Sequence, residues 1–187
     1  MRVIAGKYRG RPMRSVAGKD IRPTSDRLRE TLFNVLSPRM AGARFLDLYA
    51  GSGAVGLEAL SRGAGHVDFV ERAEPALRAL RANLARLGVA AGFRIHGAGV
   101  GAVLRKMKPG AAFDVVFLDP PYDAAEEYAA TLGLLGRNGS GLLAAGALVI
   151  AEHRKKERLE DRYGEILRTR LLKQGDAALS FYKAGEV

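Results

Sequence analysis

The stretch that decides the fold reads Phe-Leu-Asp-Leu-Tyr-Ala-Gly-Ser-Gly-Ala-Val-Gly over residues 45–56. Its apolar first residues predict a short buried strand, and its glycines open a helical pattern from Ala54 to Leu60. Glycine lets the backbone approach a ligand closely, and a helix N-terminus offers N–H groups and the positive end of a dipole. The stretch therefore predicts a loop that binds a phosphate or a carboxylate, although such a turn can also be purely structural.

Two acidic residues narrow the choice of ligand. Asp47 stands four residues before Gly51, where a carboxylate would repel a dinucleotide pyrophosphate and would suit an ammonium group, such as the one at the methionine end of S-adenosylmethionine. Glu71 follows Gly51 by twenty residues, where an acid can accept bonds from ribose hydroxyls; an exposed acid at a strand end is the alternative. The predicted cofactor-binding residues here are Asp47, Ala50, Gly51, Ser52, Gly53 and Glu71.

A second motif follows the apolar stretch 113–118, which predicts another buried strand. Asp119, Pro120, Pro121 and Tyr122 come next, and the two prolines end the strand because they donate no N–H. The Asp119 carboxylate and the Pro120 carbonyl are then rigidly placed acceptors, with the flat ring of Tyr122 beside them. This arrangement fits an exocyclic amine on a stacked base, whereas the alternative is a Pro-Pro turn with a solvated aspartate.

Together the two motifs resemble those of a known enzyme group. The segments at 47–53 and 119–122 resemble motifs I and IV of the amino-group methyltransferases that use S-adenosylmethionine. The N-terminal segments at 2–11 and 22–34 closely resemble the bacterial RsmD family, whose members methylate the exocyclic amine of one guanine in 16S ribosomal RNA. The resemblance covers nearly the whole chain.

The resemblance implies a cofactor, a partner and a chemistry. S-adenosylmethionine would be the cofactor, and the partner would be 16S ribosomal RNA, either naked or within a partly assembled small ribosomal subunit. Asp119, Pro120 and Tyr122 would be catalytic, since the two acceptors turn the amine lone pair toward the sulfonium and the ring stacks on the base. Many family members carry an acid or amide where this chain has Gly99, which leaves the backbone N–H of Val100 to contact the cofactor adenine.

The remaining pattern predicts an α/β fold, a doubly wound and mostly parallel seven-stranded sheet of the class I methyltransferase, Rossmann-like type. The last strand would be antiparallel, and a basic β-hairpin extension at 1–22 would precede a methyltransferase domain at 23–187. The expected hairpin arms are 3–5 and 12–16. The other expected strands are 44–49, 66–71, 92–96, 113–118, 146–152, 164–172 and 177–184, and the expected helices are 25–36, 54–62, 75–87, 100–107 and 124–135.

The net charge of +10 is concentrated at the N-terminus. Residues 1–44 hold eleven Lys or Arg against three Asp or Glu, a net charge of +8, and the other residues hold nineteen against seventeen, a net charge of +2. This asymmetry indicates a polyanionic partner, with a solubilising basic face as the alternative. The predicted RNA-binding residues are Arg9, Arg11, Arg22, Thr24, Arg27 and Arg29.

Composition argues against several other classes of protein. The chain has no cysteine and only three scattered histidines, so we expect neither a disulfide framework nor a metal site. Its longest apolar run, Leu142 to Ala151, is too short to span a bilayer, and the first residues do not resemble a signal peptide. We therefore expect a cytoplasmic monomer that does not associate with a membrane.

Three other functions stay open at this point. An adenine-amine methyltransferase acting on DNA or RNA would use the same Asp-Pro-Pro-Tyr motif. A catalytically idle RNA-binding assembly factor would need only the basic N-terminus, but the acids Asp47, Glu71 and Asp119 argue against it. An NAD-dependent oxidoreductase is disfavoured by Asp47, which would repel the pyrophosphate.

Overall fold

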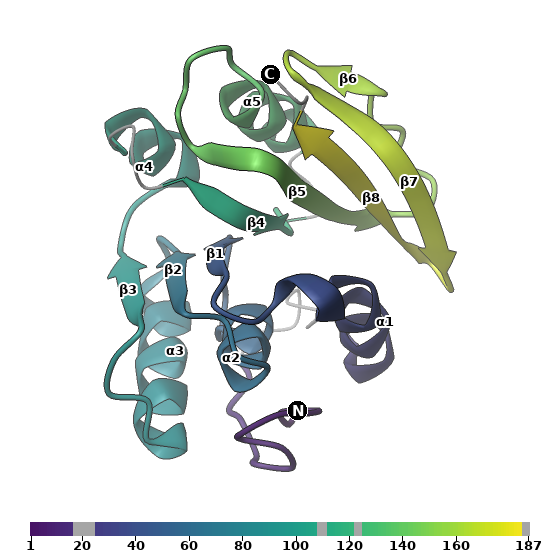
Figure 1. The fold of residues 1–187 in the computed structure, drawn as a ribbon. Coiled ribbons are helices and arrows are strands. Elements are labelled where there is room, and N and C mark those ends of the chain that lie inside the picture. The colour runs from purple at the N-terminus through teal and green to yellow at the C-terminus, as the bar shows by residue number, and fades with distance from the viewer. Residues whose placement is uncertain (17–24, 108–111, 122–124, 185–187) are drawn as a thin grey trace.

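A computed structural model of the 187-residue chain describes residues 1–16, 25–107, 112–121 and 125–184. One eight-stranded sheet runs through it in the order β3-β2-β1-β4-β5-β8-β7-β6 (Figure 1). The strands are β1 (Arg44–Leu48), β2 (His66–Val70), β3 (Phe93–His96), β4 (Phe113–Leu118), β5 (Leu143–Arg154), β6 (Arg162–Tyr163), β7 (Ile166–Gln174) and β8 (Ala177–Ala184). The helices are α1 (Asp26–Leu36), α2 (Ala54–Ser61), α3 (Glu74–Leu87), α4 (Val100–Lys106) and α5 (Ala125–Leu135), with a short 3-10 helix η1 (Ser37–Arg39).

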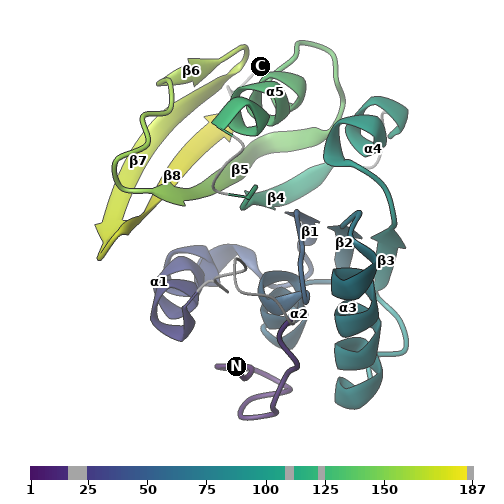
Figure 2. The same cartoon turned by 180° about the vertical axis from the view of Figure 1, so that it is seen from behind.

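The predicted doubly wound sheet is confirmed. Strands β3, β2, β1, β4 and β5 are parallel to their neighbours, and β8 is antiparallel to β5. Helices α1, α2 and α3 pack on one face of the sheet, and α4 and α5 cover the other (Figures 1 and 2). The two-residue strand β6 was not expected, and it makes the sheet eight-stranded by pairing with the start of β7.

The register places the carboxyl ends of the central strands at one level. Leu48, at the end of β1, lies opposite Val70 of β2 and Leu118 of β4. The residues that follow these three strands therefore gather at the same edge of the sheet, where ligands bind in folds of this type.

Strand β5 begins three residues earlier than predicted. Between Phe113 and Val115 of β4, the pairing shifts from Leu143 to Leu148, so β5 carries a bulge with Gly146 in the left-handed region at φ +68°. An irregular pairing of this kind breaks the alternation of side chains that a sequence pattern relies on.

The N-terminal segment 1–16 does not form the regular hairpin that was predicted. Its two arms do run antiparallel, but they are joined by a single bridge between Arg2 and Pro12 and by a few further backbone bonds. The predicted domain boundary at residue 22 lies outside the described residues.

Several N–H groups of this segment bond to α2 rather than to the opposite arm. The Glu58 carboxylate accepts bonds from the N–H groups of Ile4 at 2.8 Å and Ala5 at 3.0 Å. The N–H of Tyr8 donates to the Ser61 hydroxyl at 2.9 Å. A Cβ on Gly6 would lie 1.9 Å from the carbonyl oxygen of Ser61, so only glycine permits this close approach. The N-terminal segment therefore packs against α2 as part of the same domain, and its Val3 is fully buried.

Glu58 also compensates two arginines. It is fully buried and accepts a bond from Arg62 Nε at 2.7 Å, while Arg29 Nε lies 3.9 Å from its other oxygen. Arg29 is itself fully buried, and burial lowers its pKa although Asp26 and Glu58 act in the opposite direction. A buried cation of this kind is tolerated only beside its anions.

We expect Glu58→Gln to destabilise the protein strongly, because it leaves the Arg29 charge uncompensated and gives the Ile4 and Ala5 N–H groups a poorer acceptor. The expected loss is about 3–5 kcal/mol in the free energy of unfolding, measured by urea denaturation at pH 7. The matched control is Glu74→Gln on α3, since that side chain is 67% exposed and lies 4.0 Å from Arg78. The control should change stability by less than about 0.5 kcal/mol, and equal losses in both variants would contradict an anchoring role for Glu58.

Candidate functional site

A cavity of about 1050 Å³ opens at the carboxyl edge of the sheet, beside the ends of β1, β2 and β4. It brings together most of the cofactor-binding and catalytic residues that the sequence predicts, and its far walls come from the N-terminal segment, α4 and α5. The predicted residues that line it are Asp47, Ala50, Gly51, Ser52, Glu71, Val100, Asp119 and Pro120. Gly53 does not line the cavity and instead caps the start of α2.

Asp47 is buried, and one of its oxygens accepts a bond from the Gly56 N–H at 2.9 Å. Burial raises the pKa of this carboxyl to about 7, and the nearby charge of Glu71 acts in the same direction. Gly56 is required here because a Cβ would lie 2.3 Å from the ring of Phe69 and 2.9 Å from the Asp47 carboxylate. The third glycine of the motif therefore serves the packing of Asp47 against α2.

Glu71 holds the glycine loop in place. One of its oxygens accepts a bond from the Gly51 N–H at 2.9 Å, and the other accepts bonds from the N–H groups of Arg72 and Ala73 at 2.7 Å and 2.8 Å. The N–H of Gly51, which the sequence suggested for a ligand, is thus directed at a carboxylate. Oε1 uses both of its lone pairs in this way, and Oε2 keeps one, so the role of Glu71 toward ribose hydroxyls stays a prediction.

Asp119 follows β4 directly and is partly buried, with Pro120 buried behind it. Burial raises the pKa of Asp119 well above its usual value, and the charges of Glu152 and Asp47 act in the same direction. Glu152 is a buried acid of β5 that sequence reasoning missed. It comes one residue after Ala151, which pairs with Leu118. The sequence feature that could have pointed to Glu152 is its position as an acid directly after the apolar run of a central strand.

Tyr49 is the second site residue that the sequence did not reveal. It has φ +60°, an unusual value for a bulky side chain, and lines the cavity. Its hydroxyl lies 2.7 Å from Glu127 Oε2 and 2.7 Å from Thr131 Oγ1, both on α5. Burial raises the pKa of Tyr49. Tyr49 therefore links the end of β1 to α5 across the cavity. Its partners are far away in the sequence, so no local sequence pattern predicts this contact.

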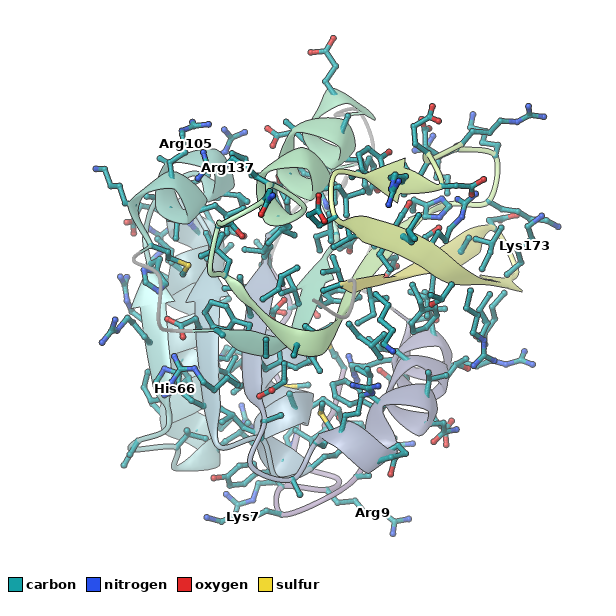
Figure 3. All side chains as sticks on the ribbon, turned by 45° about the horizontal axis from the view of Figure 1, so that its top comes forward. Lys7, Arg9, His66, Arg105, Arg137 and Lys173 are labelled. Carbon is teal, nitrogen blue, oxygen red and sulfur yellow. The ribbon has the colours of Figure 1, made fainter. Side chains whose placement is uncertain are left out.

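The predicted RNA-binding residues are dispersed. Arg29 is wrong as an RNA contact because it is buried beside Asp26 and Glu58. Arg11 is exposed, but its guanidinium donates to the carbonyl of Leu87 at 3.0 Å. Arg9 is exposed at the bottom of the view in Figure 3, where Arg105 of α4 is at the top, and Arg27 is exposed on α1. Arg22, Thr24 and the predicted catalytic Tyr122 lie outside the described residues.

Neither a metal site nor a membrane span is found in the described part of the chain. No group of three or more metal-ligating side chains is arranged to hold an ion there, although His66 and His96 both contact Asp68, at 3.2 Å and 2.7 Å. None of the described helices has the length and apolar character needed to cross a bilayer.

The chain resembles known proteins over nearly its whole length. The family model described as Conserved hypothetical protein 95 matches residues 1–183. The Ribosomal RNA small subunit methyltransferase D of Escherichia coli K12 is 39% identical over 154 residues, covering 81% of this chain and 74% of that protein. The protein of the same name from Haemophilus influenzae is 37% identical over 162 residues, covering 85% of this chain and 81% of that protein.

Solved structures also resemble the chain over its whole length. A hypothetical protein from Thermus thermophilus matches with a TM-score of 0.80 at 37% identity, covering 100% of this chain and 99% of that one. A structure from Escherichia coli matches with a TM-score of 0.86 at 34% identity and the same coverage. The chain therefore belongs to the family described as Conserved hypothetical protein 95, the RsmD family of methyltransferases.

Proposed function

We propose that this protein transfers a methyl group from S-adenosylmethionine to the exocyclic amine of a guanine in 16S ribosomal RNA of the small subunit. The observation that carries the proposal is the placement of Asp119, rigidly followed by Pro120, in the same cavity as the glycine loop and Asp47. The names of the relatives, ribosomal RNA small subunit methyltransferases, support the substrate class.

The polar groups that line the cavity fit this cofactor. Asp47 has a pKa of about 7 because it is buried near other acids, and a positively charged ammonium group beside it would favour the ionised form. Glu71 would accept a ribose hydroxyl with the remaining lone pair of Oε2, and the Val100 N–H would contact the adenine. When bound, the cofactor supplies a methyl group already activated by a positively charged sulfur, so the protein needs to provide no nucleophile.

Asp119 and the Pro120 carbonyl would then accept the two N–H groups of the guanine amine. These bonds hold the nitrogen in place and direct its lone pair at the methyl carbon, and such alignment is worth up to about 7–11 kcal/mol in well-oriented systems. As the nitrogen bonds to the methyl carbon, the bond from that carbon to sulfur would break and leave a neutral thioether, and the nitrogen becomes positive and acidic. The raised pKa of Asp119 suits it to take up the departing proton.

The order of binding follows from the same electrostatics. In the free protein the Asp119 carboxyl retains its proton to a higher pH, because it is desolvated beside Glu152 and Asp47. A protonated carboxyl has one acceptor fewer for the amine. The cationic cofactor would promote ionisation of Asp119, so we expect the base to bind productively only after the cofactor.

Asp119→Ala is the direct test of this mechanism. The interaction strengthens as charge develops on nitrogen, so its loss should lower the rate of methyl transfer by at least about 10²-fold. Asp119→Asn should be less harmful because an amide oxygen still accepts the bond. Single-turnover kinetics with saturating 16S ribosomal RNA and cofactor would measure both rates.

The matched control for that experiment is Asp114→Asn, on β4 but outside the cavity, where the carboxylate accepts the Arg44 N–H at 2.8 Å. This variant should transfer the methyl group at the wild-type rate. A near wild-type rate for Asp119→Ala would contradict the proposed reaction. Nucleoside analysis of the product by mass spectrometry distinguishes guanine from adenine as the acceptor.

Asp47→Asn should stabilise the protein at high pH and weaken cofactor binding. Because the folded-state pKa of about 7 lies above the usual 3.8, the contribution of Asp47 to stability is full below about pH 4 and is lost as the pH rises through 7. The Asn side chain avoids that loss and keeps an acceptor for Gly56. We expect the variant to gain up to about 4 kcal/mol over wild type at pH 8 and less than about 2 kcal/mol at pH 5.

Urea denaturation at the two pH values measures the stability difference, and calorimetry measures the affinity for S-adenosylmethionine. That affinity should fall at least tenfold, by about 1.4 kcal/mol, because the ammonium group loses its anion. A stability difference that is the same at pH 5 and pH 8 would show that the Asp47 pKa is not raised. An unchanged affinity would remove Asp47 from the cofactor site.

A further inference from the structure

Three exposed lysines, Lys155, Lys156 and Lys173, lie at the end of the β7–β8 hairpin, and we call them the hairpin-end lysines. The backbone holds them together. Arg154 of β5 and Gln174 of β7 both pair with Ala177 of β8, and the Lys155 N–H donates to the Asp176 carbonyl at 2.7 Å. In Figure 3, Lys173 extends from the end of the hairpin into open space.

This end of the hairpin is on the same edge of the sheet as the cavity. Strand β5 runs parallel to β4, and Ala151 pairs with Leu118, the residue before Asp119. Lys155 is three residues beyond Glu152, about 10 Å along the strand at 3.3 Å per residue, and one strand away from β4. The backbone of Lys155 therefore lies on the order of 10–12 Å from that of Asp119, so a nucleotide strand that enters the cavity would pass near it.

The charges differ between the two ends of the hairpin. Three acids, Glu160, Asp161 and Glu165, lie at the end near β6 with Arg162 and Arg168, and Asp161 pairs with Arg168. At the cavity end, the hairpin-end lysines outnumber Glu157 and Asp176. None of the three lysines forms an ion pair with another described residue. Their charges are thus directed at solvent on the edge where the substrate would enter.

Arg9 and Arg11 are poorly placed for the same task. Arg11 bonds to the carbonyl of Leu87, the last residue of α3. Because α3 begins at the cavity edge and has 14 residues, its end is about 20 Å from that edge at 1.5 Å per residue. The Lys7 N–H donates to the carbonyl of Ser61, the last residue of α2. Lys7 and Arg9 accordingly lie together at the bottom of Figure 3, away from the hairpin.

We propose that the hairpin-end lysines bind phosphates of the RNA on nucleotides next to the target guanine and so hold the strand at the cavity. This inference rests on the proposed function and adds a contact surface that the concentration of charge in residues 1–44 did not suggest. Phosphate contacts set the position and much of the affinity of a nucleic acid without reading its sequence, and lysine is suited to them as a compact charge.

The test is the triple variant Lys155→Ala, Lys156→Ala, Lys173→Ala. Each phosphate contact contributes about 0.7 to the slope of log K against log salt for a single strand, so the slope should become shallower by about 2. Binding would be measured with 16S ribosomal RNA transcribed in vitro at several salt concentrations. We expect KM for the RNA to rise at least tenfold at 0.1 M salt, with kcat at saturating RNA and the affinity for S-adenosylmethionine unchanged.

The matched control is Arg81→Ala, Arg86→Ala, Arg94→Ala. It removes three exposed charges near β3, the outermost strand on the side of the sheet away from β7 and β8. Its salt slope should equal that of wild type. An unaltered slope in the lysine variant, or an equal change in both variants, would overturn the proposal. It would also be overturned if the lysine variant bound naked RNA normally but bound isolated small ribosomal subunits more weakly, since the partner would then be a protein.

Failure of the proposed function gives a different result. If wild-type protein binds S-adenosylmethionine but methylates neither the transcribed RNA nor small subunits purified from cells lacking the protein, the reaction is wrong whatever the salt slopes are. If wild type methylates RNA and the lysine variant keeps the wild-type slope and KM, only the hairpin-end contact is wrong.

Discussion

The candidate site depends on the crowding of carboxylates at one edge of the sheet. Asp47, Asp119 and Glu152 come from β1, the end of β4 and β5, which are adjacent and parallel, so the charges of Asp47 and Glu152 act on Asp119. No described Lys or Arg forms an ion pair with Asp47 or Asp119. Burial raises both pKa values, and the charge of Glu71 adds to the effect at Asp47 as those of Glu152 and Asp47 do at Asp119, so the cavity is electrostatically complementary to a cation. An anionic cofactor would increase the repulsion, whereas an ammonium and a sulfonium group would relieve it.

The features that the sequence predicted correctly are local ones. The glycine loop after β1 and the Asp-Pro-Pro segment after β4 each depend on residues that are close together in the chain, so spacing alone locates them. The parallel order of the strands then follows from their alternation with helices, and it brings both segments to one edge. Boundaries of strands and helices were within two residues where the apolar pattern is regular, and β5 departed from prediction where a bulge interrupts the pattern.

The features that the sequence did not predict are contacts between distant segments. Arg29 was predicted to bind RNA, but Glu58 on α2 gives its charge a buried partner. Tyr49 was expected to be an ordinary strand residue, whereas its bonds to Glu127 and Thr131 fix it at the cavity in an unusual conformation. A pattern of residue types shows which side chains are polar, and it does not show which polar side chains find each other in the interior.

The attachment of the N-terminal segment has a consequence for synthesis of the chain. Its first residues leave the ribosome before their partners exist: the Ile4 N–H requires Glu58, and the Arg14 N–H bonds to Asn83, 69 residues later. Asn83 also donates to the Ser52 carbonyl in the glycine loop, and the cavity wall includes Ser15 and Val16. Such long-range contacts form late because loop closure must precede them. The segment is thus fixed in place well after it has been translated, and the part of the cavity wall that it forms is incomplete until α3 has been made and docked.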